Sequence, residues 1–88
     1  MKYRIEFKKS AANVLKKLPK PDRRRIRDKI NSFTDSLPDP ANTKMKGDNP
    51  FHRVRVGDYR IIYEIHGNTM IVVVLKIGHR KEVYRRLI

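Results

Sequence analysis

Residues 2–19 change from one hydrophobic period to another. In residues 2–8 apolar and charged side chains alternate strictly, which predicts a strand with one buried face. From Ser10, whose hydroxyl suits the N-cap of a helix, apolar residues recur at helical spacing. Pro19 cannot continue that helix. This part of the chain is therefore expected to form a strand and a short helix.

A second helix is expected to begin near Lys20, because Pro21 suits the first helical turn. Apolar residues then recur at the spacing of one side of a helix that lies on a sheet. They are Ile26, Ile30, Phe33 and Leu37. Pro38 and Pro40 follow this stripe and are expected to end the helix.

The second half of the chain alternates with a period of two, after a loop predicted over residues 38–50. Three further strands are predicted, at residues 51–56, 59–65 and 69–77. The last is almost continuously apolar, which predicts a strand at the centre of the sheet with both faces covered. Gly78 is expected to end it, and residues 79–88 to form a short C-terminal helix.

These elements follow the order β-α-α-β-β-β-α, which is typical of the α+β class. The 88 residues are too few for two separate cores, so we expect one domain over residues 1–88. The predicted arrangement is a helical hairpin packed on one face of a mainly antiparallel four-stranded sheet, with the C-terminal helix added.

The 22 Lys and Arg residues outnumber the 9 Asp and Glu residues, which gives a formal net charge of +13. Such a domain attracts polyanions: nucleic acid, the ribosome, an anionic membrane surface or an acidic protein partner. The absence of Cys excludes a disulfide framework and thiolate zinc sites. No apolar run suits a transmembrane helix or a signal peptide, so a cytoplasmic protein is expected.

The strand predicted at residues 51–56 places Arg53 and Arg55 on one face. Two guanidinium groups at this spacing suit a phosphate, although a solvent-exposed strand face would show the same alternation. Arg60 follows a short turn and is expected to lie across from them. Three arginines so placed repel one another and need an anion nearby. That anion is either a bound phosphate or, in part, the carboxylate of Glu64.

Arg80 and Tyr84 are four residues apart in the predicted C-terminal helix and so share a face. Tyr84 could stack on a base, transfer a proton or belong to the core. His52 is expected to point toward the valine side of its strand and His66 to lie in a turn. The three histidines show no metal-ligand spacing, and only His79, beside Arg80, is considered as an acid or base.

Three segments of the sequence are similar to the RelE/ParE superfamily of bacterial and archaeal toxins. They are KMKG at residues 44–47, FHRVRVGDYRIIYEI at residues 51–65 and GHRKEVYRRL at residues 78–87. The order of a strand, a helical hairpin and three strands also resembles that superfamily, so the resemblance covers essentially the whole chain.

The resemblance implies one of two activities. RelE-like members enter the ribosomal A site and cut messenger RNA, whereas ParE-like members poison DNA gyrase and lack the nuclease residues. Both are held inactive by a cognate antitoxin, here expected to be acidic and RelB-like, in a complex of higher order. A third alternative is an inactive relative that only binds its antitoxin.

Carried over by position, the RelE pattern assigns catalysis to Arg60, Arg80 and Tyr84, and His79 is added as a further catalytic candidate. RNA binding is assigned to the strand residues Arg53 and Arg55. We add the other basic candidates Lys44, Lys46, Lys16, Lys17, Arg23, Arg24 and Arg27, although those on the hairpin could equally form a solvated face. Because every RelE position holds a suitable residue, the nuclease is favoured over gyrase inhibition.

One difference from the RelE pattern concerns the proton acceptor. The strand cations are typically lysines in RelE, and a lysine can give up its proton, whereas Arg53 and Arg55 stay charged. Some relatives carry a catalytic histidine where this chain has His79. Proton transfer is therefore assigned to Tyr84 or His79, with Tyr84 preferred because Arg80 places it on the presumed active face.

The expected reaction is attack of a ribose 2′-OH on the adjacent phosphate, which leaves a cyclic phosphate and a free 5′-OH. It requires neither a metal nor a cofactor. Arg60 and Arg80 would hold the phosphate, and the strand arginines would stabilise charge. The net charge would serve binding to ribosomal RNA, and positioning by the ribosome would supply much of the catalysis.

Overall fold

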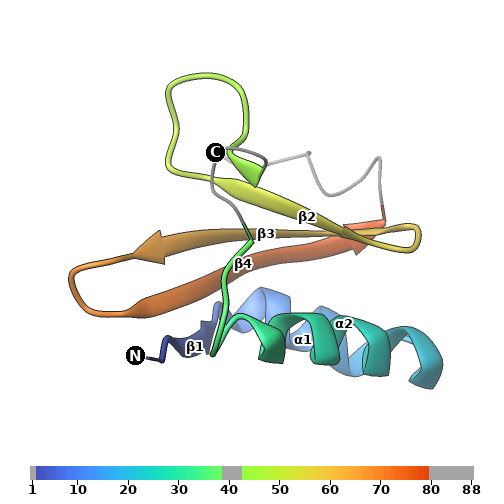
Figure 1. The fold of residues 1–88 in the computed structure, drawn as a ribbon. Helices are drawn as coiled ribbons and strands as arrows, with labels where there is room; N and C mark the ends of the chain where they lie inside the picture. The colour runs from blue at the N-terminus through green and yellow to red at the C-terminus, as the bar shows by residue number, and fades with distance from the viewer. Residues whose placement is uncertain (1, 39–42, 80–88) are drawn as a thin grey trace.

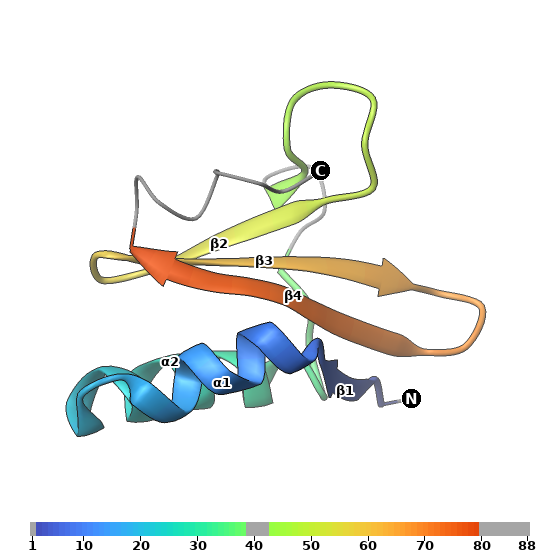
Figure 2. The same cartoon turned by 180° about the vertical axis from the view of Figure 1, so that it is seen from behind.

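The computed structural model describes residues 2–38 and 43–79 (Figures 1 and 2). The strands are β1 (Arg4–Phe7), β2 (His52–Val56), β3 (Tyr59–His66) and β4 (Ile71–His79), and the helices are α1 (Lys9–Lys17) and α2 (Lys20–Ser32). The strands form one sheet in the order β1-β4-β3-β2, with both helices on the same face. Neither of these two helices has the length and apolar content needed to cross a membrane.

The strand pairing is mixed. β1 pairs with β4 in parallel, whereas β4 with β3 and β3 with β2 are antiparallel. This confirms the predicted α+β class and the mainly antiparallel sheet under a helical hairpin. The parallel pair follows from the long connection between β1 and β4, since a parallel neighbour cannot be reached through a tight turn. The predicted C-terminal helix lies outside the described residues.

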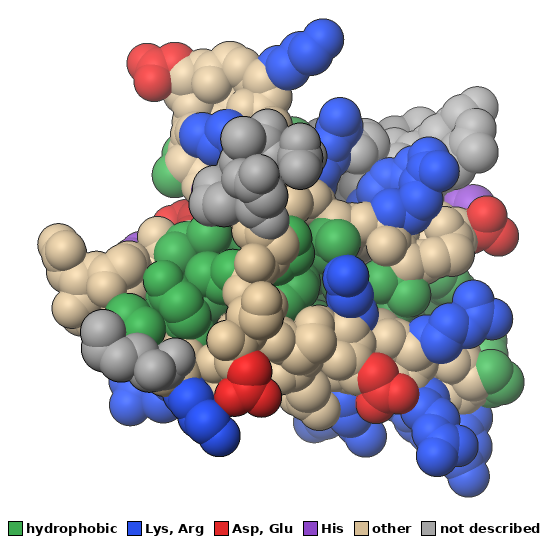
Figure 3. Space-filling model, viewed as in Figure 1, with side chains coloured by type: hydrophobic (Ala, Val, Ile, Leu, Met, Phe, Trp, Pro, Cys, Tyr) green, Lys and Arg blue, Asp and Glu red, His purple; other side chains and the backbone are tan. Residues whose placement is uncertain are grey.

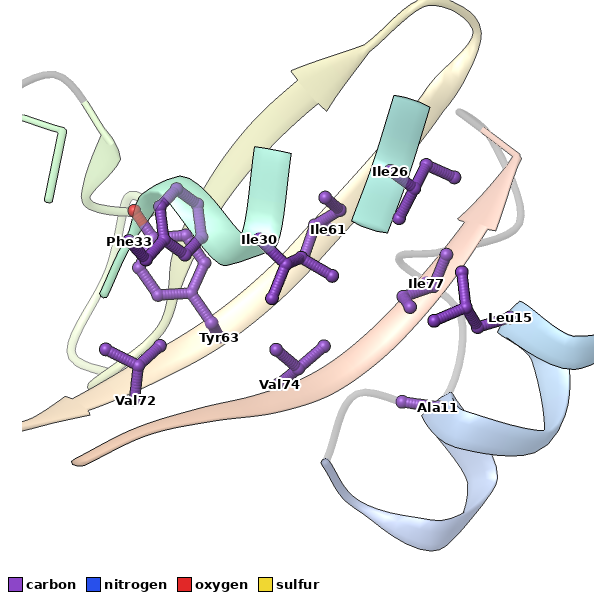
Figure 4. Packing of buried hydrophobic residues seen from close by; sticks show 10 residues of the cluster. All are labelled: Ala11, Leu15, Ile26, Ile30, Phe33, Ile61, Tyr63, Val72, Val74 and Ile77. Carbon is purple, nitrogen blue, oxygen red and sulfur yellow. The ribbon is translucent and has the colours of Figure 1, made fainter. Parts of the chain in front are cut away.

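The core lies between the helices and the sheet, and the apolar stripe of α2 supplies its centre (Figure 4). Ile26, Ile30 and Phe33 are fully buried, as their spacing predicts. The ring of Phe33 lies 5.0 Å from that of Tyr63 on β3, measured between centroids. The rest of the buried cluster is Ala11, Leu15, Ile61, Val72, Val74 and Ile77. The core cluster thus packs on the sheet face toward the helices, and on the other face Ile62 is fully buried as well.

Replacing Ile30 with alanine is expected to lower the free energy of unfolding by about 2–5 kcal/mol. Its side chain is fully buried, so truncation removes apolar contacts and leaves a cavity. Urea unfolding of the purified protein measures the change. Val14→Ala is the matched control, because Val14 is 37% exposed and its truncation opens no cavity. Similar losses in both variants would contradict this placement of the core.

The predicted start of α1 is wrong. The helix begins at Lys9 with Lys8 as its N-cap, and Ser10 lies inside it. The N–H of Lys8 donates to the carbonyl of Val74 at 2.9 Å. Strand pairing therefore continues up to the residue before the helix, and the chain turns without a side-chain cap.

The predicted end of α2 is also wrong. The helix ends at Ser32, with Phe33 as its C-cap, and does not continue to Pro38. The chain makes one further turn, in which the N–H of Ser36 donates to the carbonyl of Ser32 at 3.1 Å. The carbonyl of Thr34 then accepts the N–H of Tyr3, before β1, at 2.9 Å. Pro40, the second predicted helix breaker, lies outside the described residues.

The last strand begins and ends two residues later than predicted. β4 continues through Gly78 to His79, because Arg60 and Tyr59 of β3 pair with those two residues. Its central place in the sheet is confirmed, but full burial of both faces is not. The side chains that point toward the helices, Val72, Val74 and Ile77, are buried. Val73 and Leu75, on the other face, are partly exposed.

Candidate functional site

Three arginines of β2 and β3 meet on the sheet face turned away from the helices. Arg55 lies directly across from Arg60, and Arg53 lies across from Ile62. Residues paired in this way point to the same side of a sheet. The two valines that alternate with the β2 arginines pack against the core, so the arginines occupy the opposite side. We call the surface formed by Arg53, Arg55 and Arg60 the arginine face.

The predicted juxtaposition of Arg60 with the β2 arginines is confirmed. Arg55 is exposed, whereas Arg60 is partly buried and donates from Nη1 to the carbonyl of Tyr59 at 3.4 Å. Like charges directly opposite each other destabilise a strand pair, and a bound anion relieves that repulsion. The alternative anion, Glu64, has its carboxylate 3.3 Å from Nε2 of His66. Guanidinium groups placed this close together suit the binding of a phosphate.

Lys76 of β4 lies on the same sheet face, and the sequence pattern did not reveal it. The register shifts between Ile62 and Tyr63, so Leu75 has no partner across the strand pair. This extra residue changes which face of the sheet the following side chains of β4 point to. Val74 faces the helices, and Lys76, which pairs with Ile62, faces away from them. Strict alternation from Val74 would turn Lys76 into the core. A continuously apolar strand carries no alternation that could show the change.

The structure does not bring His79 to the arginine face. His79 pairs with Tyr59, whose side chain packs against the core on the helix side, and the two rings meet edge to face at 5.8 Å. The Tyr59 hydroxyl donates to Oδ2 of Asp22 at 3.3 Å. Partial burial and the charge of Asp22 raise the pKa of the Tyr59 phenol. His79 therefore borders a different hollow, of about 220 Å³, beside the start of α2.

His52 points to the helix side, as predicted, and takes part in a buried polar cluster. Its Nδ1 lies 2.9 Å from Oγ1 of Thr43, and its ring stacks on that of Tyr63 at 5.5 Å. Burial, and secondly the positive charge of Lys44, lower the pKa of His52. His52 is thus a neutral part of the core and does not belong to the arginine face.

Stability is expected to fall as the pH drops below about 6.5, the pKa of a histidine in an unfolded chain. Because the folded pKa of His52 is lowered, the unfolded chain binds the proton more tightly, and acid favours unfolding. Thermal unfolding on both sides of that pH measures the loss. His52→Gln is expected to remove most of the dependence, whereas the control His66→Gln, at an exposed position, is expected to keep it.

The remaining basic candidates lie in two other places. Lys44 and Lys46 are exposed in the loop before β2. The backbone of Lys44 forms an isolated antiparallel β-bridge with that of His52, the first residue of β2. The others are on the helical hairpin: Lys16, Lys17, Arg23, Arg24 and Arg27. Figure 3 shows Lys and Arg side chains gathered along these helices. Two further site candidates, Arg80 and Tyr84, lie outside the described residues.

The comparisons with known proteins agree with this architecture. Residues 5–84 match the family described as the ParE toxin of the type II toxin–antitoxin system, parDE. Toxin RelE3 of Methanocaldococcus jannaschii is 34% identical, and the match covers 92% of this chain and 94% of RelE3.

Solved structures give the same result. The RelE chain of the Methanococcus jannaschii RelB–RelE complex is 30% identical, with a TM-score of 0.71 over 94% of this chain and 99% of that one. The archaeal RelE–RelB complex from Pyrococcus horikoshii OT3 is similar at 26% identity, with a TM-score of 0.75 over 92% and 98%. The chain therefore belongs to the RelE/ParE superfamily of toxins of type II toxin–antitoxin systems.

Proposed function

We propose that the protein is a RelBE-type toxin that cleaves messenger RNA on the ribosome. The observation that carries the proposal is the arginine face, in which Arg55 lies directly across from Arg60 with Arg53 beside them. A cluster of guanidinium groups on the sheet face away from the helices suits the phosphate of a single-stranded nucleic acid. The similarity to proteins named RelE agrees with this activity.

In the proposed reaction the ribose 2′-oxygen attacks the adjacent phosphorus, and the bond from phosphorus to the 5′-oxygen breaks. The 2′-OH loses its proton to a base, and the leaving 5′-oxygen gains one from an acid. The products are a 2′,3′-cyclic phosphate and a 5′-OH, with no oxidant or reductant required. Arg60 holds the phosphate, and Arg53 and Arg55 stabilise the extra negative charge of the transition state.

The proton acceptor must come from outside the arginine face, since guanidinium groups do not deprotonate at working pH. Of the two candidates, His79 points to the helix side of the sheet. We therefore assign proton transfer to Tyr84 and a second phosphate contact to Arg80, the residue four positions before it.

The basic hairpin supplies contacts to ribosomal RNA in this proposal. Neutralising Lys16, Lys17, Arg23, Arg24 and Arg27 with glutamine is expected to weaken ribosome binding and to flatten its salt dependence. Each lost phosphate contact reduces the slope of log affinity against log salt by about 0.7–0.9. Binding to ribosomes over a salt series measures the slope. An unchanged slope would mean that the hairpin charges only keep the protein soluble.

We propose an acidic, RelB-like antitoxin as the partner, in a complex of higher order in the cytoplasm. The related RelE chains of Methanococcus jannaschii and Pyrococcus horikoshii were solved with RelB. The net charge of +13 favours an acidic partner over a neutral one.

Inhibition of DNA gyrase is the second candidate, because the matching family is described as the ParE toxin. The two activities are separated by adding the purified protein to a defined translation reaction and mapping messenger RNA ends, with a gyrase supercoiling assay in parallel. New RNA ends that require ribosomes support the nuclease. Blocked supercoiling with intact RNA supports the gyrase inhibitor, and neither effect indicates an inactive relative.

A further inference from the structure

A hollow of about 380 Å³ lies beside the arginine face, between the start of α1 and the strands. Its lining includes Lys8, Ser10, Val14, Phe51, Glu64 and Lys76. It exists because β1 is short: its pairing with β4 ends at Val74, so the next residues of β4 have no strand beside them on that edge. The size suits one nucleotide or a similar small group.

The strand register connects this hollow to the arginine face. Arg53, Ile62 and Lys76 form one row across β2, β3 and β4. Neighbouring strands lie about 4.8 Å apart, so Lys76 is attached about 10 Å from Arg53 on the same sheet face. Phe51 precedes His52, which points to the helices, so the aromatic ring belongs to the face that also carries Glu64. One extended RNA segment can contact both places.

We propose that the hollow binds a base of the RNA next to the phosphate held by the arginine face, an inference that rests on the proposed function. Phe51 provides a ring on which any base can stack. Lys8 and Lys76 provide ammonium donors for the flanking phosphates. The carboxylate of Glu64 accepts hydrogen bonds but donates none when ionised, so it selects bases that carry an amino group.

The chemistry of this lining favours a nucleotide over an acidic peptide. Glu64 places a negative charge in the hollow, which repels a carboxylate side chain. Its carboxylate oxygens can accept a hydrogen bond from the amino group of adenine or cytosine. Uracil has no amino group and presents carbonyl oxygens on both sides of its N–H. The hollow is therefore expected to bind adenine and cytosine more tightly than uracil.

The test is an NMR titration of the full chain with the RNA trinucleotides rA3, rC3 and rU3. The methyl groups of Val14 and Leu75 and the ring of Phe51 report on the hollow. We expect these signals to shift with rA3 and rC3 at several-fold lower concentration than with rU3. Glu64→Gln is expected to reduce that preference, because its amide also donates to the uracil carbonyls.

Phe51→Leu is expected to weaken trinucleotide binding at least about fivefold, because stacking is lost. Phe7→Leu is the matched control: Phe7 is 38% exposed, and it pairs with Val74, which faces the helices. Thermal unfolding checks that both variants are folded, and Lys76→Gln provides a second, smaller change in the same hollow. Equal binding by the Phe51→Leu and Phe7→Leu proteins would overturn the proposal.

One other outcome would also overturn it: trinucleotides that shift no signal of the hollow, whether or not a hexaglutamate peptide shifts those signals. Cleavage on ribosomes is measured separately with the same variants. Cleavage without base binding in the hollow rejects this inference alone. Base binding in the hollow without cleavage supports it and contradicts the nuclease function.

Discussion

Replacing Arg60 with alanine is expected to lower the rate of messenger RNA cleavage on the ribosome about 100-fold or more, while the protein stays folded and binds its antitoxin. Arg60 lies directly across from Arg55 on the sheet face away from the core, so truncation removes a phosphate contact and no core packing. Losing one preorganised donor to transition-state charge has an effect of this size. Single-turnover cleavage of ribosome-bound messenger RNA gives the rate.

Arg4→Ala is the matched control for Arg60→Ala. Arg4 is exposed on β1, and its Nη2 lies 3.2 Å from Oε2 of Glu6. An exposed ion pair contributes little to stability, and this one lies outside the arginine face. The Arg4→Ala protein is expected to cleave at the wild-type rate. Full cleavage by a folded Arg60→Ala protein would refute the assignment of the phosphate to the arginine face.

Replacing Tyr84 with phenylalanine is expected to have the second large effect, a loss of about 100-fold or more in the cleavage step. The substitution keeps the aromatic ring and removes only the hydroxyl that would transfer the proton. His79→Gln is expected to leave the rate nearly unchanged, because the imidazole meets Tyr59 on the helix side of the sheet. Single-turnover cleavage by each variant over about pH 6–9 separates the two residues.

The opposite pattern, a large loss in His79→Gln and a small one in Tyr84→Phe, would move proton transfer to the histidine. That result would also require the RNA to reach the helix side of the sheet near Tyr59. Comparable small losses in both variants would mean that the ribosome or the RNA itself supplies the base. Each result therefore leads to a different mechanism for the same arginine face.

The hydrophobic pattern by itself determined the fold class and most of the core. Ile26, Ile30 and Phe33 are buried at the positions that a helical period selects. The alternation in β2 likewise placed Arg53 and Arg55 on the side away from the core. These features could be predicted because a helix or strand orients its side chains through its own backbone geometry, without help from distant residues.

The helix boundaries and the phase of β4 were decided only by the tertiary structure. Ser10 is a good N-cap in isolation, but Lys8, whose N–H donates to the carbonyl of Val74, is the N-cap, and the helix starts earlier. Likewise, nothing in the sequence near Leu75 shows the register shift that turns Lys76 toward the arginine face. Such features depend on hydrogen bonds between segments far apart in the chain, which local periodicity does not encode.

The residues of the candidate site were also determined partly by the local sequence pattern and partly by the tertiary structure. Short-range reasoning brought Arg60 beside the β2 arginines, because a tight hairpin fixes which residues oppose each other. His79 was also considered as an acid or base, because it adjoins Arg80 and some relatives carry a catalytic histidine there. Pairing with Tyr59 instead extends β4 and turns His79 to the other face. Because residues paired across a sheet point to the same side, inclusion of His79 in β4 decides which groups it can act with.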